Sequence, residues 1–316
     1  MAKNAAKRVT GEEIWLDGKF VKWADANVHI LTHTLHYGLG VFEGIRCYKG
    51  VDGRSAIFRL QEHVRRLFDS AKINLMTIPF TPAEIEAACL ESLKRNHLEA
   101  GYVRPLAFIG DGAMGLHPGE NPVRVAVIAW EWGKYLGDEG MAKGIRAKIS
   151  TFARHHVNAT MTNGKTCGDY VNSILAKREA NADGYSEAIL LDTNGYVSEA
   201  SGENVFAVIG KTLYTAPFSG PVLGGITRDT LITLAGEEGL QVKEMSLTRD
   251  TLYLADEVFM CGTAAEVTPV REIDRRVIGA GARGPVTERL QERYFDVVRG
   301  SDASHDQWLS YYEPQS

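Results

Sequence analysis

Cysteine is scarce in this chain of 316 residues. The four cysteines, Cys47, Cys89, Cys167 and Cys261, stand far apart and form no Cys-x-x-Cys pair. A disulfide framework or a tetrahedral zinc site needs a recognisable cysteine spacing, so neither is expected here. The pattern favours a reducing compartment, and we expect a cytoplasmic protein without a metal centre.

Long apolar runs and a basic surface are also missing. The longest apolar run, VAVIAW at residues 125–130, is much shorter than the roughly 20 residues that cross a bilayer. The basic start MAKNAAKR is not followed by the apolar core of a signal peptide. A net charge of −5, with 35 Lys and Arg against 40 Asp and Glu, argues against nucleic acid as a partner. Small molecules are therefore the expected partners.

What is present is typical of a globular protein with two domains. Hydrophobic residues make up 44% of the chain and charged residues 24%, and the length is about twice that of one ordinary domain. The segment GKYLGDEGMAKG is rich in glycine and charge, as linkers often are. We predict a small N-terminal domain at 1–132, an interdomain loop at 133–144 and a larger C-terminal domain at 145–316.

Local signals predict the elements of the first domain. The Asp17-Gly18 pair indicates a hairpin turn, and periodic apolar residues predict a helix over about 61–73. Thr81 and Glu84 form a capping box with proline after the first residue, so a second helix begins there. Two strands at 102–109 and 124–132 are joined by the glycine-rich loop 110–122, which we expect to line a site.

The second domain is predicted to be richer in strands. We expect strands at 144–151, around the Asn194-Gly195 turn and, broken by a turn, at 256–270. Helices are expected at 169–184, after the Gly224-Gly225 pair and, as a closing element, at 284–298.

The stretch HYGLGVFEGIR, residues 36–46, raises the question of a dinucleotide site. Gly38, Gly40 and Gly44 give G-x-G-x-x-x-G, whereas the dinucleotide motif is G-x-G-x-x-G, and the following IRCYKG predicts a strand where the motif needs a helix. A nicotinamide site is therefore disfavoured. The better interpretation is a strand whose glycines let another backbone pass close by.

Two further segments allow a functional and a structural interpretation. Gly224-Gly225-Ile226-Thr227 opens a predicted helix, so its free N–H groups suit a phosphate, but a tight turn with Thr227 as an ordinary N-cap is equally compatible. Lys165, in TNGKTCGDY, has the surroundings of a nucleophile or base, yet most lysines are solvated surface charges. The residues alone leave both alternatives open.

Several ordered blocks nevertheless resemble one enzyme family. HYGLGVFEGIRCY, YVRPLAF, GYVSEASGENVF, GITRD and LYLADEVFMCGTAAEVTPV are similar to the branched-chain amino acid aminotransferases, class IV aminotransferases of fold type IV that use pyridoxal 5′-phosphate. The resemblance runs from IWLDGKFVKW to GPVTERLQERYF, almost the whole chain. It implies a mixed α+β fold, with a small N-terminal α/β two-layer domain and a larger barrel-like domain that anchors the cofactor.

The resemblance also implies an activity and a set of cofactor residues. The activity is transamination between leucine, isoleucine or valine and 2-oxoglutarate, which gives branched-chain 2-oxo acids and L-glutamate. Lys165 binds the cofactor covalently and moves the substrate Cα proton, Glu199 keeps the pyridine nitrogen protonated, and Tyr170 binds the phenolic oxygen. Asp169 departs from the commoner asparagine. The residues implied at the phosphate end are Arg59, Gly225, Ile226, Thr227, Gly262 and Thr263.

A second set of residues is implied for the substrate. Arg104 reaches the distal carboxylate of glutamate, and the backbone of Thr263 and Ala264 receives the α-carboxylate. The other walls are Tyr37, Phe42, Tyr102, Trp132 and Tyr135, although core packing is the alternative for Phe42, Trp132 and Tyr135. In the family a homodimer shares its sites, so the second subunit supplies Tyr37 and the loop Met114-Gly115-Leu116; assembly into a homohexamer is a further expectation.

Other functions remain as alternatives. A D-amino acid aminotransferase, an (R)-selective amine transaminase and an aminodeoxychorismate lyase share the implied fold, but YVRP and GVFEGIR favour the branched-chain type. An alternative of another class is a binding or regulatory homologue without catalysis. The joint presence of Lys165, Tyr170, Glu199 and Arg59 argues against that alternative.

Overall fold

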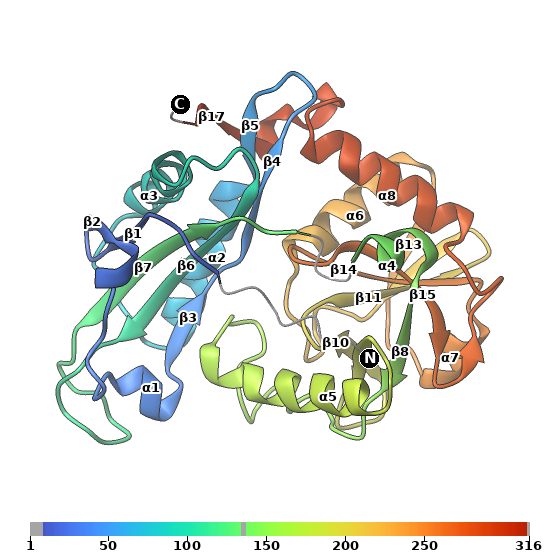
Figure 1. Ribbon diagram of the computed structural model, residues 1–316. Helices are drawn as coiled ribbons and strands as arrows, with labels where there is room; N and C mark the ends of the chain where they lie inside the picture. Colours follow the sequence, from blue (N-terminus) through green and yellow to red (C-terminus); the bar gives the residue numbers. More distant parts are fainter. Residues whose placement is uncertain (1–8, 134–136, 315–316) are drawn as a thin grey trace.

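Two β-sheets form two lobes that lie side by side (Figure 1). The computed structural model describes residues 9–133 and 137–314. The eight-stranded first sheet of this described part has the order β17-β5-β4-β6-β7-β1-β2, and β3 pairs with β6. Its strands are β1 (Glu13–Leu16), β2 (Lys19–Lys22), β3 (Gly40–Phe42), β4 (Ile45–Lys49), β5 (Ser55–Phe58), β6 (Gly101–Ile109), β7 (Val123–Trp130) and β17 (Leu309–Tyr312).

Helices cover the first sheet and close its core. They are α1 (His33–Tyr37), α2 (Leu60–Ile73) and α3 (Pro82–Arg95). The predicted capping box is confirmed, because Glu84 N donates to Thr81 Oγ1 at 3.3 Å and Thr81 N donates to Glu84 Oε2 at 2.7 Å. The apolar faces of α2 and α3 pack with the sheet into one buried cluster that includes Val64, Leu67 and Ile85.

The second sheet is larger and curls on itself. Its order within the described chain is β10-β9-β8-β15-β14-β11-β12-β13, with β16 beside β15. Ala200 N donates to Glu203 O at 2.7 Å across the turn from β10 to β11, so two strands far apart in the sheet order meet. The strands are β8 (Ile145–Ile149), β9 (Glu187–Leu191), β10 (Val197–Ala200), β11 (Asn204–Ile209), β12 (Thr212–Thr215), β13 (Gln241–Glu244), β14 (Glu257–Gly262), β15 (Glu266–Ile273) and β16 (Arg276–Val277).

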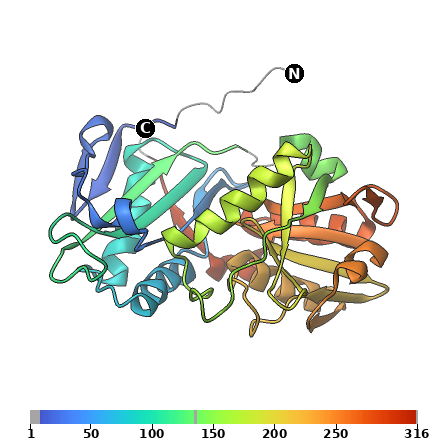
Figure 2. The ribbon, with the colours of Figure 1, turned by 90° about the horizontal axis from the view of Figure 1, so that it is seen from below.

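The second lobe carries most of the remaining helices. They are α4 (Gly137–Lys143), α5 (Tyr170–Ala182), α6 (Ile226–Glu237), α7 (Arg249–Leu254) and α8 (Pro285–Val298). Short 3₁₀ helices are η1 (Trp23–Asp25), η2 (Cys167–Asp169) and η3 (Ala303–Trp308). Figure 2 shows α5 running along the junction of the lobes. In the described part of the chain, no helix is long and apolar enough to cross a membrane.

A shared core joins the two lobes. Tyr48 of β4 and Phe58 of β5 lie in one buried cluster with Phe206 of β11, Leu231 of α6 and Tyr294 of α8. Burial of large side chains at a junction fixes the two bodies relative to each other. A site between the lobes therefore has firm walls.

Three parts of the fold differ from the sequence expectation. Residues 33–37 form the short helix α1, which ends at Gly38 in a left-handed conformation (φ 76°), so the strand begins only at Gly40. Part of the expected loop 133–144 is helical, because Met141 is buried and α4 packs on β15. Strand β17 lies in the first sheet, although its residues belong to the range 145–316. The proposed division into domains at residues 133–144 otherwise stays a prediction.

Candidate active site

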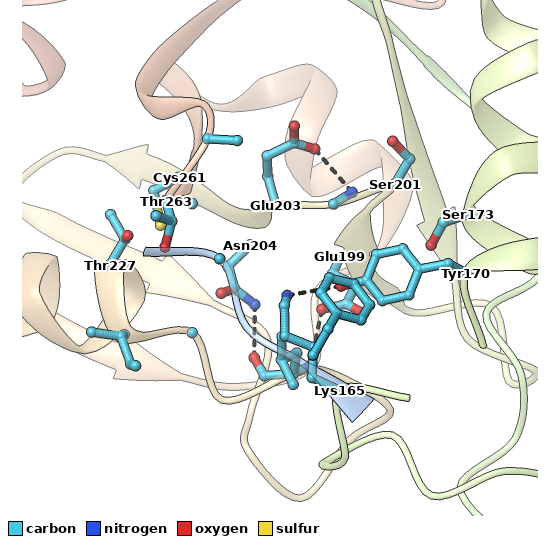
Figure 3. A pocket seen from close by; sticks show the side chains of 18 of the residues that line it. Lys165, Tyr170, Ser173, Glu199, Ser201, Glu203, Asn204, Thr227, Cys261 and Thr263 are labelled. Atoms are coloured by element: carbon cyan, nitrogen blue, oxygen red, sulfur yellow. Dashed lines mark hydrogen bonds between the residues drawn. The ribbon is translucent and has the colours of Figure 1, made fainter. Parts of the chain in front are cut away.

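A cavity of about 290 Å³ lies between the lobes. Both sheets contribute to its wall, as do the starts of α5 and α6 (Figure 3). Thirteen of the residues expected from the sequence line it: Phe42, Tyr102, Arg104, Trp132, Lys165, Tyr170, Glu199, Gly225, Ile226, Thr227, Gly262, Thr263 and Ala264. Segments that are distant in the sequence thus meet at one place.

Lys165 lies in the loop that precedes α5 and is fixed through its backbone. Its N–H donates to Ser70 Oγ of α2 at 3.0 Å, and its carbonyl accepts from Phe42 N of β3 at 3.1 Å. The backbone is held by these two hydrogen bonds, and the side chain extends into the cavity. There Nζ donates to the Tyr170 hydroxyl at 2.8 Å (Figure 3). The Tyr170 ring packs on Phe42, with ring centroids 4.9 Å apart. A lysine amine beside a phenol is a nucleophile and base in a fixed orientation.

Glu199, on β10, is a buried carboxylate with both oxygens held. Oε1 pairs with Arg154 Nη2 at 2.9 Å, and Oε2 accepts from the Leu223 N–H at 2.9 Å. Arg154 is itself oriented by Ser173, whose Oγ accepts from Nη1 at 3.3 Å. A carboxylate fixed in this way presents negative charge to whatever occupies the cavity.

The other end of the cavity is suited to an anion. Gly225 precedes α6, so the first N–H groups of this helix lack partners within the helix and lie at the positive end of its dipole. Thr227 adds a buried hydroxyl, and Figure 3 shows Thr227 and Thr263 across the cavity from Tyr170. A Cβ on Gly225 would lie 2.0 Å from Asn204 Oδ1, so only glycine lets this loop come so close.

The substrate side of the cavity is an aromatic wall that carries one cation. The Tyr102 ring lies 4.9 Å from the Trp132 ring and 5.1 Å from the Trp130 ring. The guanidinium carbon of Arg104 lies 4.6 Å from the centre of the Phe42 ring. Gly44 makes room for this wall, because a Cβ there would lie 1.8 Å from the Tyr102 hydroxyl. The close approach of another backbone that was expected at the glycines of residues 36–46 is found at Gly38, where a Cβ would lie 3.0 Å from Gly168 Cα, whereas the close neighbour of Gly44 is a side chain.

Some expected residues lie elsewhere. Arg59 is not among the described residues that line the cavity; its Nη1 donates to Asp229, Thr230 and the Ile226 carbonyl, and its Nε to Glu62. Tyr37, Met114, Gly115 and Leu116 also lie away from the cavity wall that the structure describes. Tyr135 falls outside the described residues.

The cavity contains polar residues that the sequence reasoning did not select. Arg66, Arg154 and Glu203 line it, as do Asn204, Ser173, Ser201 and Thr162. Burial and the nearby charge of Glu187 raise the pKa of Glu203 to about 8, so its carboxyl is mostly protonated at neutral pH. The GEN sequence beside Glu199 was the one available signal for Glu203 and Asn204.

Asp169, the departure from the commoner asparagine, also lines the cavity. Its Oδ2 lies 4.0 Å from Nε2 of His155. Burial raises the pKa of Asp169 above its ordinary value, and burial together with Arg154 lowers the pKa of His155 to about 4. Both shifts are in the direction of the uncharged forms.

The donor set is that of an organic cofactor with an anionic end. Within residues 9–133 and 137–314, no three His, Cys, Asp or Glu side chains gather as metal ligands. A lysine amine and a fixed carboxylate lie opposite a helix start that suits phosphate, and Gly225, Ile226 and Thr227 of that helix start line the cavity. Pyridoxal 5′-phosphate has an aldehyde, a ring nitrogen and a phosphate to match these groups.

Comparisons with known proteins agree with this geometry. Residues 40–273 match the family described as amino-transferase class IV. The branched-chain-amino-acid aminotransferase of Pseudomonas aeruginosa is 52% identical over 295 residues, which cover 93% of this chain and 95% of the relative.

Solved structures give the same result. The crystal structure of the Escherichia coli branched-chain amino acid aminotransferase has a TM-score of 0.93 at 45% identity, covering 95% of this chain and 99% of the other. The branched-chain amino acid aminotransferase of T.th., solved with pyridoxamine 5′-phosphate, has a TM-score of 0.93 at 48% identity, covering 96% and 99%. The backbone of this chain is therefore shared with a protein that was solved with pyridoxamine 5′-phosphate.

Proposed function

The chain belongs to the class IV aminotransferases, and on this premise we propose that it transfers the amino group of leucine, isoleucine or valine to 2-oxoglutarate. It uses pyridoxal 5′-phosphate, and the products are a branched-chain 2-oxo acid and L-glutamate. The observation that carries the proposal is the placement of Lys165, Glu199 and the start of α6 around one cavity. An aminotransferase that uses this cofactor needs an amine that binds the aldehyde, a carboxylate beside the ring nitrogen and a site for the phosphate.

Each end of the cavity holds a different part of the cofactor. The N–H groups of Ile226 and Thr227 and the hydroxyl of Thr227 bind the phosphate at the start of α6, next to Gly262 and Thr263. Glu199 holds the proton of the ring nitrogen, with Arg154 and the Leu223 N–H fixing its carboxylate plane. Tyr170 would donate its hydroxyl hydrogen to the phenolic oxygen of the cofactor, and the same hydroxyl accepts from Lys165 Nζ.

The bound cofactor supplies an electron-withdrawing ring that stabilises the negative charge left at the substrate Cα. Lys165 Nζ holds the cofactor between turnovers, and with substrate bound its amine takes the proton from Cα. The Tyr170 hydroxyl orients this amine, and the Ser70 hydroxyl and the Phe42 N–H fix the lysine backbone. The chain thus holds the amine that accepts the Cα proton in a fixed position.

Substrate choice follows from the aromatic wall. An aliphatic side chain is taken up by Phe42, Tyr102 and Trp132, whose rings exclude water. Glutamate carries a second carboxylate into the same place, and Arg104 is the cation that receives it. The backbone at Thr263 and Ala264 takes the α-carboxylate that all these substrates share.

Replacement of Arg104 by methionine is expected to separate the two substrate classes. The long apolar chain keeps contact with Phe42 but cannot pair with a carboxylate, so kcat/KM for 2-oxoglutarate falls by about 10²-fold, as expected for loss of a buried charge pair. For branched-chain 2-oxo acids the change stays within about threefold. The measurement is steady-state kinetics with both acceptors.

A matched control is Arg124→Met. Arg124 also lies over an aromatic ring, Phe108 at 5.5 Å, but it pairs with Asp17 outside the cavity, so both acceptors keep their rates. Equal losses of kcat/KM for the two acceptors in the Arg104 variant would show that Arg104 supports the packing of the aromatic wall and does not bind the distal carboxylate.

The residues that lie away from the cavity fit a shared active site. The exposed fraction is 45% for Tyr37, 41% for Met114 and 89% for Leu116. His33 Nε2 contacts the Gly115 carbonyl at 2.7 Å, so α1 and the loop lie together as one surface. We propose that in a homodimer this surface reaches the cavity of the partner subunit, and that a homohexamer of such dimers is the larger assembly. The cytoplasmic location stays a prediction from the cysteine pattern.

The proposed function is tested by assay and by covalent trapping. Purified protein with pyridoxal 5′-phosphate is expected to convert leucine and 2-oxoglutarate into glutamate, with isoleucine and valine as further donors. Borohydride reduction is expected to fix the cofactor on the peptide that contains Lys165, as detected by mass spectrometry. Preference for D-alanine or for a primary amine as donor would favour a different member of the same fold.

A further inference from the structure

The hairpin turn that is expected to receive the substrate α-carboxylate ends in a residue with an unusual backbone. Gly262 of β14 pairs with Glu266 of β15, so residues 263–265 form a three-residue turn between the two strands. Glu266 has a left-handed backbone, with φ 55°, and turns of this length usually have glycine in that conformation. The conformation is unfavourable for a residue with a Cβ, so other contacts must hold it.

The side chain of Glu266 contacts the first lobe. It is buried, and its Oε1 accepts from the Tyr48 hydroxyl at 3.0 Å and from Arg46 Nη2 at 3.4 Å. Arg46 and Tyr48 are two residues apart on β4, so both side chains leave the same face of the first sheet. The turn of one lobe is therefore hydrogen-bonded to a strand of the other lobe.

The hydrogen bond from Tyr48 to Glu266 has a defined direction. Burial and the nearby charge of Glu266 raise the pKa of Tyr48 well above its ordinary value, so the hydroxyl keeps its hydrogen. Because that hydrogen is donated to Glu266, the Tyr294 hydroxyl of α8, 3.2 Å away, is the donor in its contact with Tyr48. Both hydroxyl groups of this buried chain thus have partners, which favours one fixed arrangement.

Arg46 connects the same carboxylate to the substrate wall. Its Nη1 donates to the Gly133 carbonyl at 3.2 Å, and Gly133 directly follows Trp132 of the aromatic wall. On the other side of the turn, Thr268 Oγ1 donates to the Ala265 carbonyl at 2.7 Å. The turn is thus held from both lobes, and the wall is held by one of the same side chains.

We propose that Glu266 and Tyr48 are positioning residues that orient the turn at residues 263–265 toward the substrate α-carboxylate. Backbone N–H groups bind an anion well only when their peptide planes are already fixed toward it. The hydrogen bond from Tyr48 holds Glu266 in its left-handed conformation, and that conformation sets the peptide planes of the turn. Neither side chain is among the described residues that line the cavity, so both act through the turn. The inference rests on the proposed function, because the carboxylate is that of the amino acid substrate.

The proposal predicts a loss of binding that depends on the carboxylate of the ligand. Tyr48→Phe keeps the ring in the core shared by the lobes but removes the donor to Glu266. The inhibition constant of 4-methylpentanoate, which has the chain and the carboxylate of leucine, is expected to rise about 3- to 30-fold, as for loss of a hydrogen bond to a charged group. That of 3-methylbutylamine, which is leucine without its carboxylate, is expected to stay within about twofold of wild type. Both constants are measured on the holoenzyme in competition with leucine.

Two further variants make the test robust. Glu266→Gln keeps an acceptor for the Tyr48 hydroxyl but removes the charge that faces Arg46, so a smaller loss that again depends on the carboxylate is expected. Tyr253→Phe is the matched control. The Tyr253 hydroxyl donates to Asp274 Oδ2 at 2.7 Å, and Asp274 is also left-handed, with φ 48°, but neither residue is among those described at the cavity. This variant is expected to bind both ligands like the wild type.

The outcomes separate the positioning role from the proposed function. Unchanged inhibition by 4-methylpentanoate in both Tyr48→Phe and Glu266→Gln would overturn the positioning role, and so would equal losses for the carboxylate and the amine. A wild-type holoenzyme that neither transaminates leucine nor binds 4-methylpentanoate would instead overturn the proposed function, and the positioning role with it.

Discussion

Replacement of Lys165 by alanine is expected to lower kcat for leucine by about 10⁴-fold or more, the upper range for removal of a positioned proton-transfer group. The variant loses both the amine that holds the cofactor and the base that takes the Cα proton. The fold should remain, since the lysine backbone keeps its contacts with Ser70 and Phe42. The loss of reaction with leucine is measured from single-turnover absorbance changes, and retention of the fold is measured by circular dichroism.

Lys72→Ala is the control for this experiment. Lys72 is an exposed lysine of α2, so its removal changes the charge of the protein by the same amount without touching the cavity. Its kcat is expected to match the wild type. A Lys165→Ala protein that kept its activity within about tenfold would show that another group moves the proton.

Replacement of Glu199 by glutamine is expected to give the second largest loss. The amide keeps the shape of the side chain but removes the negative charge that favours a protonated ring nitrogen. A neighbouring opposite charge shifts a pKa by about 1–3 units, so loss of the Glu199 charge would lower the pKa of the ring nitrogen and kcat should fall about 10- to 10³-fold at neutral pH. Arg154 is left without its carboxylate, which adds a cost to stability. Steady-state kinetics measure the fall in kcat, and thermal unfolding measures the loss of stability.

Glu203→Gln is the comparison for Glu199→Gln. It is the same chemical change in the same cavity, but burial and Glu187 raise the pKa of Glu203 to about 8. Below that pH the wild-type carboxyl is protonated and uncharged, so the amide changes kcat by less than about threefold at about pH 6–7. Above about pH 8 the wild type gains a buried negative charge and the variant does not, so their pH profiles should separate there. Coinciding profiles up to about pH 9 would contradict this assignment.

Features set by neighbours in the sequence could be predicted. The capping box at Thr81, the hairpin at Asp17-Gly18 and the helix start at Gly225 depend on contacts within a few residues. Lys165 and Glu199 were assigned through the resemblance, since no local rule distinguishes a cavity lysine from a surface lysine. Both line the cavity.

Features set by distant contacts could not be predicted. Arg66 donates to the Gly224 carbonyl, 158 residues away, and Arg154 forms an ion pair with Glu199 of β10. The residues next to each arginine in the sequence do not indicate which partner it contacts. The helix α4 forms in a segment with two glycines because Met141 is buried against β15, and such packing outweighs intrinsic helix preference.

The place of β17 has a consequence for how the chain is made. Residues 309–312 pair with residues 55–58, and the Trp308 carbonyl accepts from the Arg59 N–H at 2.6 Å while the Trp308 ring lies under the Arg59 guanidinium. During synthesis the first lobe emerges with the edge of β5 uncovered, and its sheet stays incomplete until residues 309–312 have also been made. The first lobe therefore completes its sheet only after the strands and helices of the second lobe have been synthesised.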